Sequence, residues 1–227
     1  MQVRPVSGKA SRMDDPFLIE TGVSDEQDAM KETLKAALAQ RQNTVYSRPA
    51  VGKERKVFRT ELAKALRAEA KRYVQPTPVS DVERDNAQSE TDSDAEDCTT
   101  ERELIPALDA EHCEAIRRIS ENFSTRFGEI LKDKRFRYGT AQKALNLYLK
   151  FLWRLGLLGD GKPPHCPADG TILEAAGLRG KSWTWLDDEK EYVRWIEAMR
   201  KVASPLDLAD WEYQTWRPQA SKPKPCA

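Results

Sequence analysis

The segment from Thr140 to Leu155 constrains the fold of this chain more than any other. Its apolar residues recur around most of the circumference of a helix and leave only a narrow polar stripe. Because a helix of this kind exposes too much apolar surface when it stands alone, we expect it at the centre of a helical domain. The apolar positions are Ala141, Ala144, Leu145, Leu147, Tyr148, Leu149, Phe151, Leu152 and Leu155.

Further helices are predicted wherever a capping residue precedes apolar residues at helical spacing. We find no convincing strand pattern and no repeat in the sequence, so the predicted fold class is all-α. The helices are expected from Ser24, which forms a capping box with Gln27; from Lys53 to Val74; from Asp109, as N-cap, to Leu131; from Asp169, as N-cap, to near Gly177; and from Asp188 to Val202. The last helix is expected to open with Ser204-Pro205-Leu206-Asp207, with Ser204 as N-cap, Pro205 at the first helical position and Asp207 at the third.

The charges of the chain lie in blocks, although the formal net charge is +0. Arg41 to Arg72 contains ten Lys and Arg against three acidic residues, whereas Asp81 to Glu103 contains ten Asp and Glu against two Arg. The acidic block has almost nothing apolar to bury, so we expect it to be disordered. It is either a solvated spacer or an acidic mimic that shields a basic surface until a nucleic acid displaces it.

These patterns divide the chain into five segments. We expect a mobile N-terminus at 1–23, basic amphipathic helices at 24–75, a disordered acidic linker at 76–103, a compact helical domain at 104–217 and a mobile tail at 218–227. The beginning of the chain has no apolar run that fits a signal peptide, and no later run approaches the roughly 18 apolar residues of a membrane span. We therefore expect a cytoplasmic protein without a membrane partner.

The cysteines and histidines give no sign of a metal site. The four Cys residues lie far apart without a CxxC motif, which favours reduced thiols over disulfides. Each His precedes a Cys, at His112-Cys113 and His165-Cys166, but neighbouring residues on a helix point about 100° apart and do not easily share one ion. We expect neither a metal nor a cofactor.

The polar stripe of the central helix has two interpretations. Its members Gln142, Lys143, Asn146, Lys150 and Arg154, with Trp153 beside them, project within an arc of about 120°. They form either the solvated edge of a buried helix or a basic strip for phosphate contact and base stacking. The basic residues directly upstream favour the second interpretation. The predicted nucleic-acid-binding residues are Lys132, Lys134, Arg135, Arg137, Asn146, Lys150, Trp153 and Arg154.

Six Trp residues occur, most of them expected in the core. Trp183 and Trp185 alternate in a segment without helical spacing, so we expect at least one of them to be exposed for stacking on a base.

Gly139, Lys143, the long apolar helix and the later Pro167-Ala168-Asp169 together resemble the pattern of helix-hairpin-helix DNA glycosylases, nearest to the archaeal-type 8-oxoguanine members. The stretch "SPLDLADWEYQTW" is similar to their C-terminal helix, while only Gly139 remains of their glycine-rich turn. The resemblance implies that Lys143 attacks the anomeric carbon of a flipped nucleotide and that Asp169 supports the cationic transition state. The same residues are also similar to an uncharacterised bacterial family of helical proteins, which implies no function.

The leading hypothesis is a DNA-associated helical protein in which the basic segments Arg41 to Arg72 and Lys132 to Arg154 bind phosphates, with a possible glycosylase-like site at Lys143 and Asp169. The alternative is a non-enzymatic helical adaptor that binds protein partners, with Asp169 serving only as an N-cap. The sequence leaves open whether the protein is an enzyme.

Overall fold

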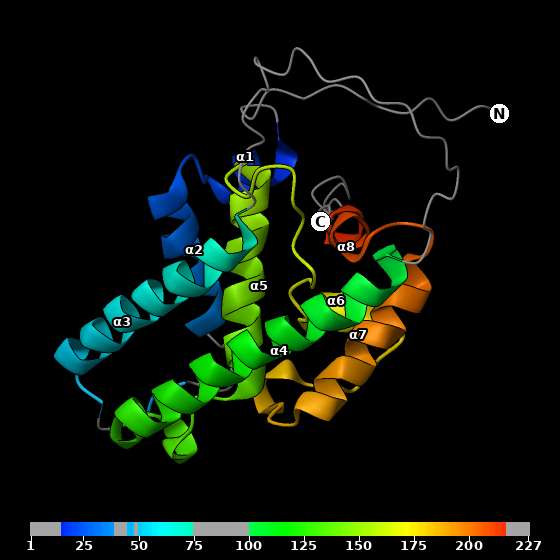
Figure 1. Ribbon diagram of the computed structural model, residues 1–227. Coiled ribbons are helices and arrows are strands. Elements are labelled where there is room, and N and C mark those ends of the chain that lie inside the picture. Colours follow the sequence, from blue (N-terminus) through cyan, green and yellow to red (C-terminus); the bar gives the residue numbers. More distant parts are fainter. Residues whose placement is uncertain (1–14, 39–44, 48–49, 75–99, 217–227) are drawn as a thin grey trace, which may run out of the picture.

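A computed structural model describes residues 15–38, 45–47, 50–74 and 100–216, and of 100–107 it describes the backbone only. Within these ranges the chain forms eight α-helices joined by loops and short 3-10 turns and contains no strand, which confirms the all-α prediction (Figure 1). The helices are α1 (Pro16–Thr21), α2 (Glu26–Leu38), α3 (Gly52–Ala70), α4 (Thr100–Phe127), α5 (Tyr138–Arg154), α6 (Gly170–Ala175), α7 (Glu189–Ala203) and α8 (Leu208–Trp216).

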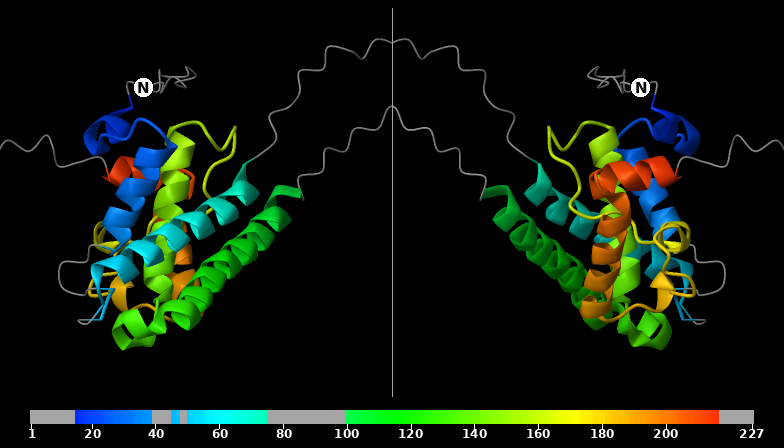
Figure 2. Two further views of the ribbon diagram at one scale, coloured as in Figure 1. Left: turned by 90° about the vertical axis from the view of Figure 1, so that its left-hand side faces the viewer. Right: turned by 90° about the vertical axis from the view of Figure 1, so that its right-hand side faces the viewer.

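Helix α5 lies at the centre of the fold, as its apolar circumference predicts. Helices α2 and α3 pack on one side of it, α4 crosses it, and α6, α7 and α8 lie on the other side (Figures 1 and 2). Thirteen of the 17 residues of α5 are buried, so nearly every face of the helix meets a neighbour.

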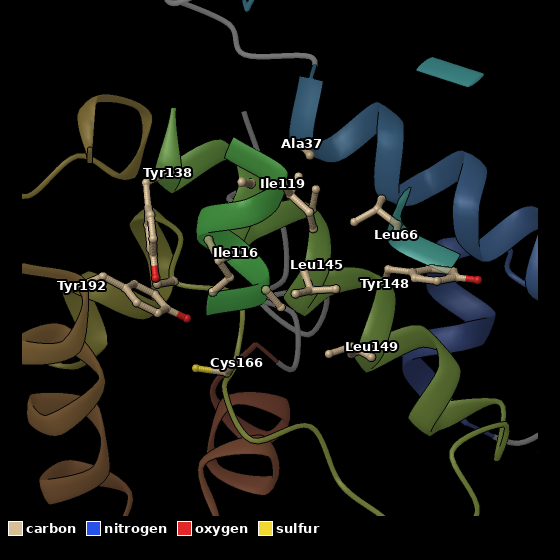
Figure 3. Close-up of a cluster of buried hydrophobic side chains, with 14 of the residues drawn as sticks. Ala37, Leu66, Ile116, Ile119, Tyr138, Leu145, Tyr148, Leu149, Cys166 and Tyr192 are labelled. Atoms are coloured by element: carbon tan, nitrogen blue, oxygen red, sulfur yellow. The ribbon is translucent and has the colours of Figure 1, made fainter. Parts of the chain in front are cut away.

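The core that surrounds α5 is shared by helices from both ends of the described chain. The labelled side chains of Figure 3 come from α2 (Ala37), α3 (Leu66), α4 (Ile116 and Ile119), α5 (Tyr138, Leu145, Tyr148 and Leu149), α7 (Tyr192) and the loop before α6 (Cys166). Helices α2 and α3 therefore pack into the same apolar cluster as the helices that follow residue 100. None of the described helices is long and apolar enough to cross a lipid bilayer.

The structure corrects the first predicted helix start. Ser24 bonds the Asp28 side chain, and Asp25 instead accepts the hydrogen bond from the Asp28 amide, so Ser24 forms no capping box. The sequence prediction also missed α1, which begins within the segment expected to be mobile. Its N-cap is Asp15, whose side chain accepts hydrogen bonds from two amides of the first turn.

Two further helix starts differ from prediction. Helix α4 begins at Thr100, nine residues before the predicted cap, so Asp109 lies inside the helix and forms tertiary contacts. Ser204 is the C-cap of α7 and not the N-cap of α8, which begins at Leu208. The starts of α5, α6 and α7 agree with prediction within two residues. Asp169 is the side-chain N-cap of α6, as predicted, and Asp188 is the side-chain N-cap of α7. The predictions for 1–14, 76–99 and 218–227 lie outside the described residues.

Candidate functional site along the polar stripe of α5

Three members of the polar stripe of α5 are buried, which corrects the interpretation of these three as part of a solvated surface, whereas Lys143, Trp153 and Arg154 are half-buried. Gln142 and Asn146 are 0% exposed and Lys150 is 3% exposed. Asn146 and Lys150 therefore do not belong to an exposed phosphate-binding surface. Because a buried polar group needs partners, the function of the stripe depends on what each side chain contacts.

Gln142 holds the loop that precedes α6. Its amide Nε2 donates to the carbonyl oxygen of Ala168 over 3.1 Å, and its Oε1 accepts from the Ala168 amide over 3.2 Å. A side-chain amide that bonds both the N–H and the C=O of one residue fixes the position and the direction of the backbone at that residue. Asp169, the next residue, is thereby placed beside α5.

Asn146 links α5 to three other parts of the fold. Its Nδ2 donates to the Cys166 carbonyl and to the Tyr192 hydroxyl, each over 3.0 Å. Its Oδ1 lies 2.6 Å from Nε2 of His112 on α4. Asn146 is therefore the junction of a polar network inside the core, and no base or phosphate is needed to satisfy it.

The two buried histidines belong to the same network, and their partners fix their protons. His165 directs Nε2 at the Asp109 carboxylate over 3.1 Å, so this nitrogen carries the proton and Nδ1 accepts from the Tyr192 hydroxyl over 3.0 Å. With the protons of His165 placed, the donor and the acceptor of each other hydrogen bond in the network follow. Asn146 donates to Tyr192, His112 donates from Nε2 to Asn146, and Tyr73 donates to Nδ1 of His112.

Burial keeps both histidines neutral. Loss of solvation lowers the pKa of His112 and of His165, whose rings lie 4.5 Å apart. For Asp109 burial alone would raise the pKa, but hydrogen bonds from Arg200 and His165 outweigh it and hold the pKa well below its usual range. The network thus ends in an Asp109–Arg200 ion pair that joins α4 to α7.

The cysteines next to these histidines are unsuited to act as nucleophiles. Burial raises the pKa of Cys113 to about 11 and raises the pKa of Cys166 as well, so both remain protonated thiols at neutral pH. Within the described part of the chain, no group of three or more His, Cys, Asp or Glu residues is placed to hold a metal ion.

Lys143 and Asp169 are in direct contact. The Lys143 ammonium lies 3.0 Å from Asp169 Oδ2, and both side chains are mostly buried. Asp169 Oδ1 meanwhile accepts hydrogen bonds from the amides of Thr171 and Ile172 at the start of α6. Asp169 is therefore both an ion-pair partner and an N-cap, and the Trp183 ring lies 4.7 Å from the Lys143 ammonium.

A second lysine–carboxylate pair lies two turns further along α5 and is buried more deeply. The Lys150 ammonium lies 2.9 Å from Oε1 and 2.8 Å from Oε2 of Glu212 on α8, and each side chain is only 3% exposed. The Lys150 ammonium also lies 4.3 Å from the Phe17 ring centre and 4.8 Å from that of Trp216. Burial lowers the pKa of Lys150 and raises that of Glu212, and both shifts favour the uncharged forms of the pair.

Both pairs line one small pocket, which we call the lysine pocket. Its volume is about 170 Å³, and it lies among α1, α2, α5, α8 and the loop before α6. Apolar walls come from Phe17, Leu147, Phe151, Pro167 and Trp216. Glu32 also lines it, so two amines and three carboxylates reach a space with apolar walls, an arrangement typical of a site for acid–base or amine chemistry.

The basic residues before α5 are neutralised by nearby carboxylates. Lys134 pairs with Glu129 over 3.1 Å, Arg135 pairs with Asp187 over 3.2 Å, and Arg137 pairs with both Asp133 and Asp187. At the end of α5, Arg154 pairs with Asp15 and packs on the partly buried Trp153 ring. These pairs reduce the net positive charge that the surface presents to a phosphate.

Trp185 is the exposed one of the two alternating tryptophans, as predicted for at least one of them. It is 51% exposed, whereas Trp183 packs against the core. The Lys132 ammonium lies 4.9 Å and the Arg137 guanidinium 4.6 Å from the centre of the Trp185 ring.

A larger basic feature lies between α2 and α3, and we call it the basic groove. Its volume is about 780 Å³, and six cationic residues line it together with Met30, Leu34 and Ala63. The cationic residues are Lys31, Arg55, Lys56, Arg59, Lys64 and Arg67, and no carboxylate lines the groove within the described chain. Lys31, Lys64 and Arg67 pair with acids beyond its lining, whereas Lys56 and Arg59 have no acidic partner among the described residues.

Comparison with known proteins does not assign the chain to a family, because no family model, no curated protein and no solved structure matches it. The resemblance to DNA glycosylases therefore rests on the quoted residues alone.

Proposed function

We propose that the protein binds a nucleic acid, and that the basic groove between α2 and α3 contacts the phosphate backbone. The observation that carries this proposal is the lining of the groove, in which six Lys and Arg residues occur without a carboxylate. Cationic side chains that neutralise phosphates release condensed counterions, which supplies most of the affinity in sequence-independent binding.

The spacing along α3 supports this assignment. Arg55 and Arg59 are four residues apart, so they lie on one face of α3 about 6 Å apart along its axis, and Lys56 lies beside them. The apolar floor of Met30, Leu34 and Ala63 is suited to contact with sugars.

The groove and the lysine pocket lie on opposite sides of α2. Met30 and Leu34 line the groove, whereas Glu32 and Ala36 line the pocket. Because helical residues turn by about 100° each, the two sets of side chains project in nearly opposite directions. A nucleic acid held in the groove is therefore not positioned to present a base to Lys143. Base release by Lys143 and Asp169 is a separate proposal with a test of its own.

The groove proposal is tested by titrating a fluorescein-labelled DNA duplex with the full chain at rising salt and following the anisotropy. We expect binding at low salt and a steep loss of affinity as salt rises, since counterion release weakens at high salt. Absence of binding at low salt, or an affinity independent of salt, contradicts the proposal. The helical adaptor that binds protein partners is then the better description.

A further inference from the structure

The buried Lys150–Glu212 pair calls for an explanation beyond stability. Removing two charges from water costs free energy that their attraction offsets only in part, and apolar residues of similar size are often as stable in such a position. Helix α8 already buries Leu208 and Trp211 in the main core, so it has apolar contacts that hold it in place. An ion pair retained among aromatic rings beside a pocket is typical of a reactive site.

The position of the pair fits such a site. Lys150 and Glu212 both line the lysine pocket, and the ring centres of Phe17 and Trp216 lie 4.3 and 4.8 Å from the ammonium. Apolar walls exclude water, and a carboxyl group lies within 2.9 Å of the nitrogen to take or give a proton. These are the conditions under which a lysine acts as a nucleophilic amine.

We propose that Lys150 forms a Schiff base with a small aldehyde or ketone bound in the lysine pocket, and that Glu212 transfers the protons. Within the pair, Lys150 passes a proton to Glu212 and becomes a neutral amine, so the pocket gains no net charge. Burial favours this transfer, because it lowers the pKa of Lys150 and raises that of Glu212.

The reaction balances without any further reagent. The Lys150 nitrogen attacks the carbonyl carbon, a C–N bond forms, and the C=O electron pair moves to oxygen. Glu212 donates its proton to this oxygen and takes one of the two protons of the cationic nitrogen, which gives a neutral carbinolamine and a protonated Glu212. Glu212 then donates its proton to the departing hydroxyl group, which leaves as water while the nitrogen lone pair forms the C=N bond. The product is a protonated imine beside a Glu212 carboxylate, so one water is released and the charges of the original pair are restored.

The volume of the pocket sets the class of carbonyl compound. Its 170 Å³ corresponds to about six water molecules at roughly 30 Å³ each, which admits a chain of a few carbon atoms. The apolar walls favour an uncharged alkyl chain. The Lys143–Asp169 pair lies two helical turns away and bounds the pocket at that end.

The first experiment compares lysines within the native, full-length chain. The protein is treated with propionaldehyde and sodium cyanoborohydride at neutral pH, and alkylated lysines are located by peptide mass mapping at increasing times. Lys201 is the reference, because it is exposed on α7 and has no ion-pair partner among the described residues. We expect Lys150 to be alkylated at least about tenfold faster than Lys201, since a lower pKa leaves more free amine. Alkylation of Lys201 first, with Lys150 unmodified in the folded protein, overturns the proposal.

Two variants separate reactivity from folding. Lys150→Met alone leaves a buried Glu212 without its partner and is expected to destabilise the fold, so it is compared with the double variant Lys150→Met/Glu212→Leu, which restores an apolar contact. The double variant should fold and lose the rapid alkylation.

Glu212→Gln keeps the lysine but removes the proton carrier, so alkylation of Lys150 should slow. Equal rates in Glu212→Gln and the natural protein refute the role of Glu212, and rapid alkylation in the double variant refutes Lys150 as its site.

Discussion

His112 donates a hydrogen bond from Nε2 to Asn146 Oδ1 over 2.6 Å, at a position where neither side chain contacts solvent. On the other side of the ring, Nδ1 lies 2.7 Å from the Tyr73 hydroxyl at the end of the α3 segment. Both ring nitrogens of the neutral His112 thus form hydrogen bonds, which connect α4 to α5 and to the 3-10 turn that follows α3. A proton added to this ring would lie beside His165 without a carboxylate of its own, so the network depends on pH.

The first prediction is that the protein loses stability in mild acid. The native state holds the pKa of His112 and of His165 below the ordinary value, so the unfolded chain binds protons that the folded chain does not. Stability is therefore complete above a pH of about 6.5 and falls as the pH is lowered through that value, by up to about 1.4 kcal/mol per pH unit for each histidine. Urea unfolding at pH 7.5 and pH 5.5 should differ by roughly 2 kcal/mol.

The matched variant for this prediction is His112→Gln, which keeps an amide donor for Asn146 and does not titrate. It should remove about half of the difference between the two pH values. A difference that stays the same in this variant would show that His112 is not among the groups responsible.

The second prediction concerns Gly139, which lies in the first turn of α5. A Cβ atom at this position would lie 1.8 Å from the Trp183 carbonyl oxygen, and the Gly139 amide donates to the Leu186 carbonyl over 2.8 Å. Gly139→Ala should therefore destabilise the protein by about 3 kcal/mol, because the backbone at Trp183 would have to move to make room for the added Cβ. Gly170→Ala is the control, since nothing lies within 4 Å of its added Cβ, and it should change stability by less than about 0.5 kcal/mol. Thermal unfolding of both variants checks this, and equal effects would contradict it.

The helices of this fold are predictable because their signals are local. The apolar positions of 140–155 and the N-caps Asp169 and Asp188 lie within the segments that they specify, and the structure has helices there. Helix α1 was missed because its six residues are too few for a periodic pattern, although Asp15-Pro16, a cap followed by proline at the first helical position, was a usable signal. Asp109 was misread as a cap because its partners, His165 and Arg200, are distant in the sequence.

The site was less predictable because its residues, like Asp109, have partners that are distant in the sequence. Gln142 and Asn146 looked like a solvated edge because polar residues on a helix are usually exposed, and nothing next to them in the sequence shows what they bind. Their partners Ala168 and Tyr192 follow 26 and 46 residues later. Likewise the burial of Lys150 depends on Glu212, 62 residues further on. A sequence indicates which side of a helix is polar, but whether another segment covers that side depends on the tertiary structure.

The third prediction tests Lys143 and Asp169 as a glycosylase-like pair. If Lys143 attacks a flipped nucleotide, wild-type protein incubated with lesion-bearing duplexes and borohydride should become covalently linked to DNA, and Lys143→Gln should abolish the link. Asp169→Asn should slow base release but keep the α6 cap, since asparagine caps nearly as well as aspartate. If no tested lesion yields base release or a covalent link, the enzyme hypothesis is wrong.

The fourth prediction concerns Asp169 as the N-cap of α6, a role that does not depend on enzymatic activity. Its carboxylate accepts hydrogen bonds from two amides at the start of α6, and Asp169→Ala removes both. The loss should be about 1 kcal/mol of stability. Asp169→Asn keeps the cap and loses only the charge of the Lys143 pair, so the difference between these variants in urea unfolding measures the cap alone. Equal stability of the two variants would contradict the capping role.

The last prediction separates the basic groove from the rest of the positive surface. Lys56 and Arg59 are exposed on α3 without acidic partners among the described residues, so replacing them removes phosphate contacts without breaking ion pairs. The double variant Lys56→Ala/Arg59→Ala should weaken DNA binding and make the slope of log K against log salt shallower by about 2, since each lost contact accounts for about 0.9. The matched control is Lys190→Ala/Arg194→Ala, which removes the same two charges from exposed positions on α7. If binding depends on net charge alone, both double variants lose affinity equally and the groove is not the site. If it depends on the groove, only the α3 variant changes the slope, whereas circular dichroism should show that both remain folded.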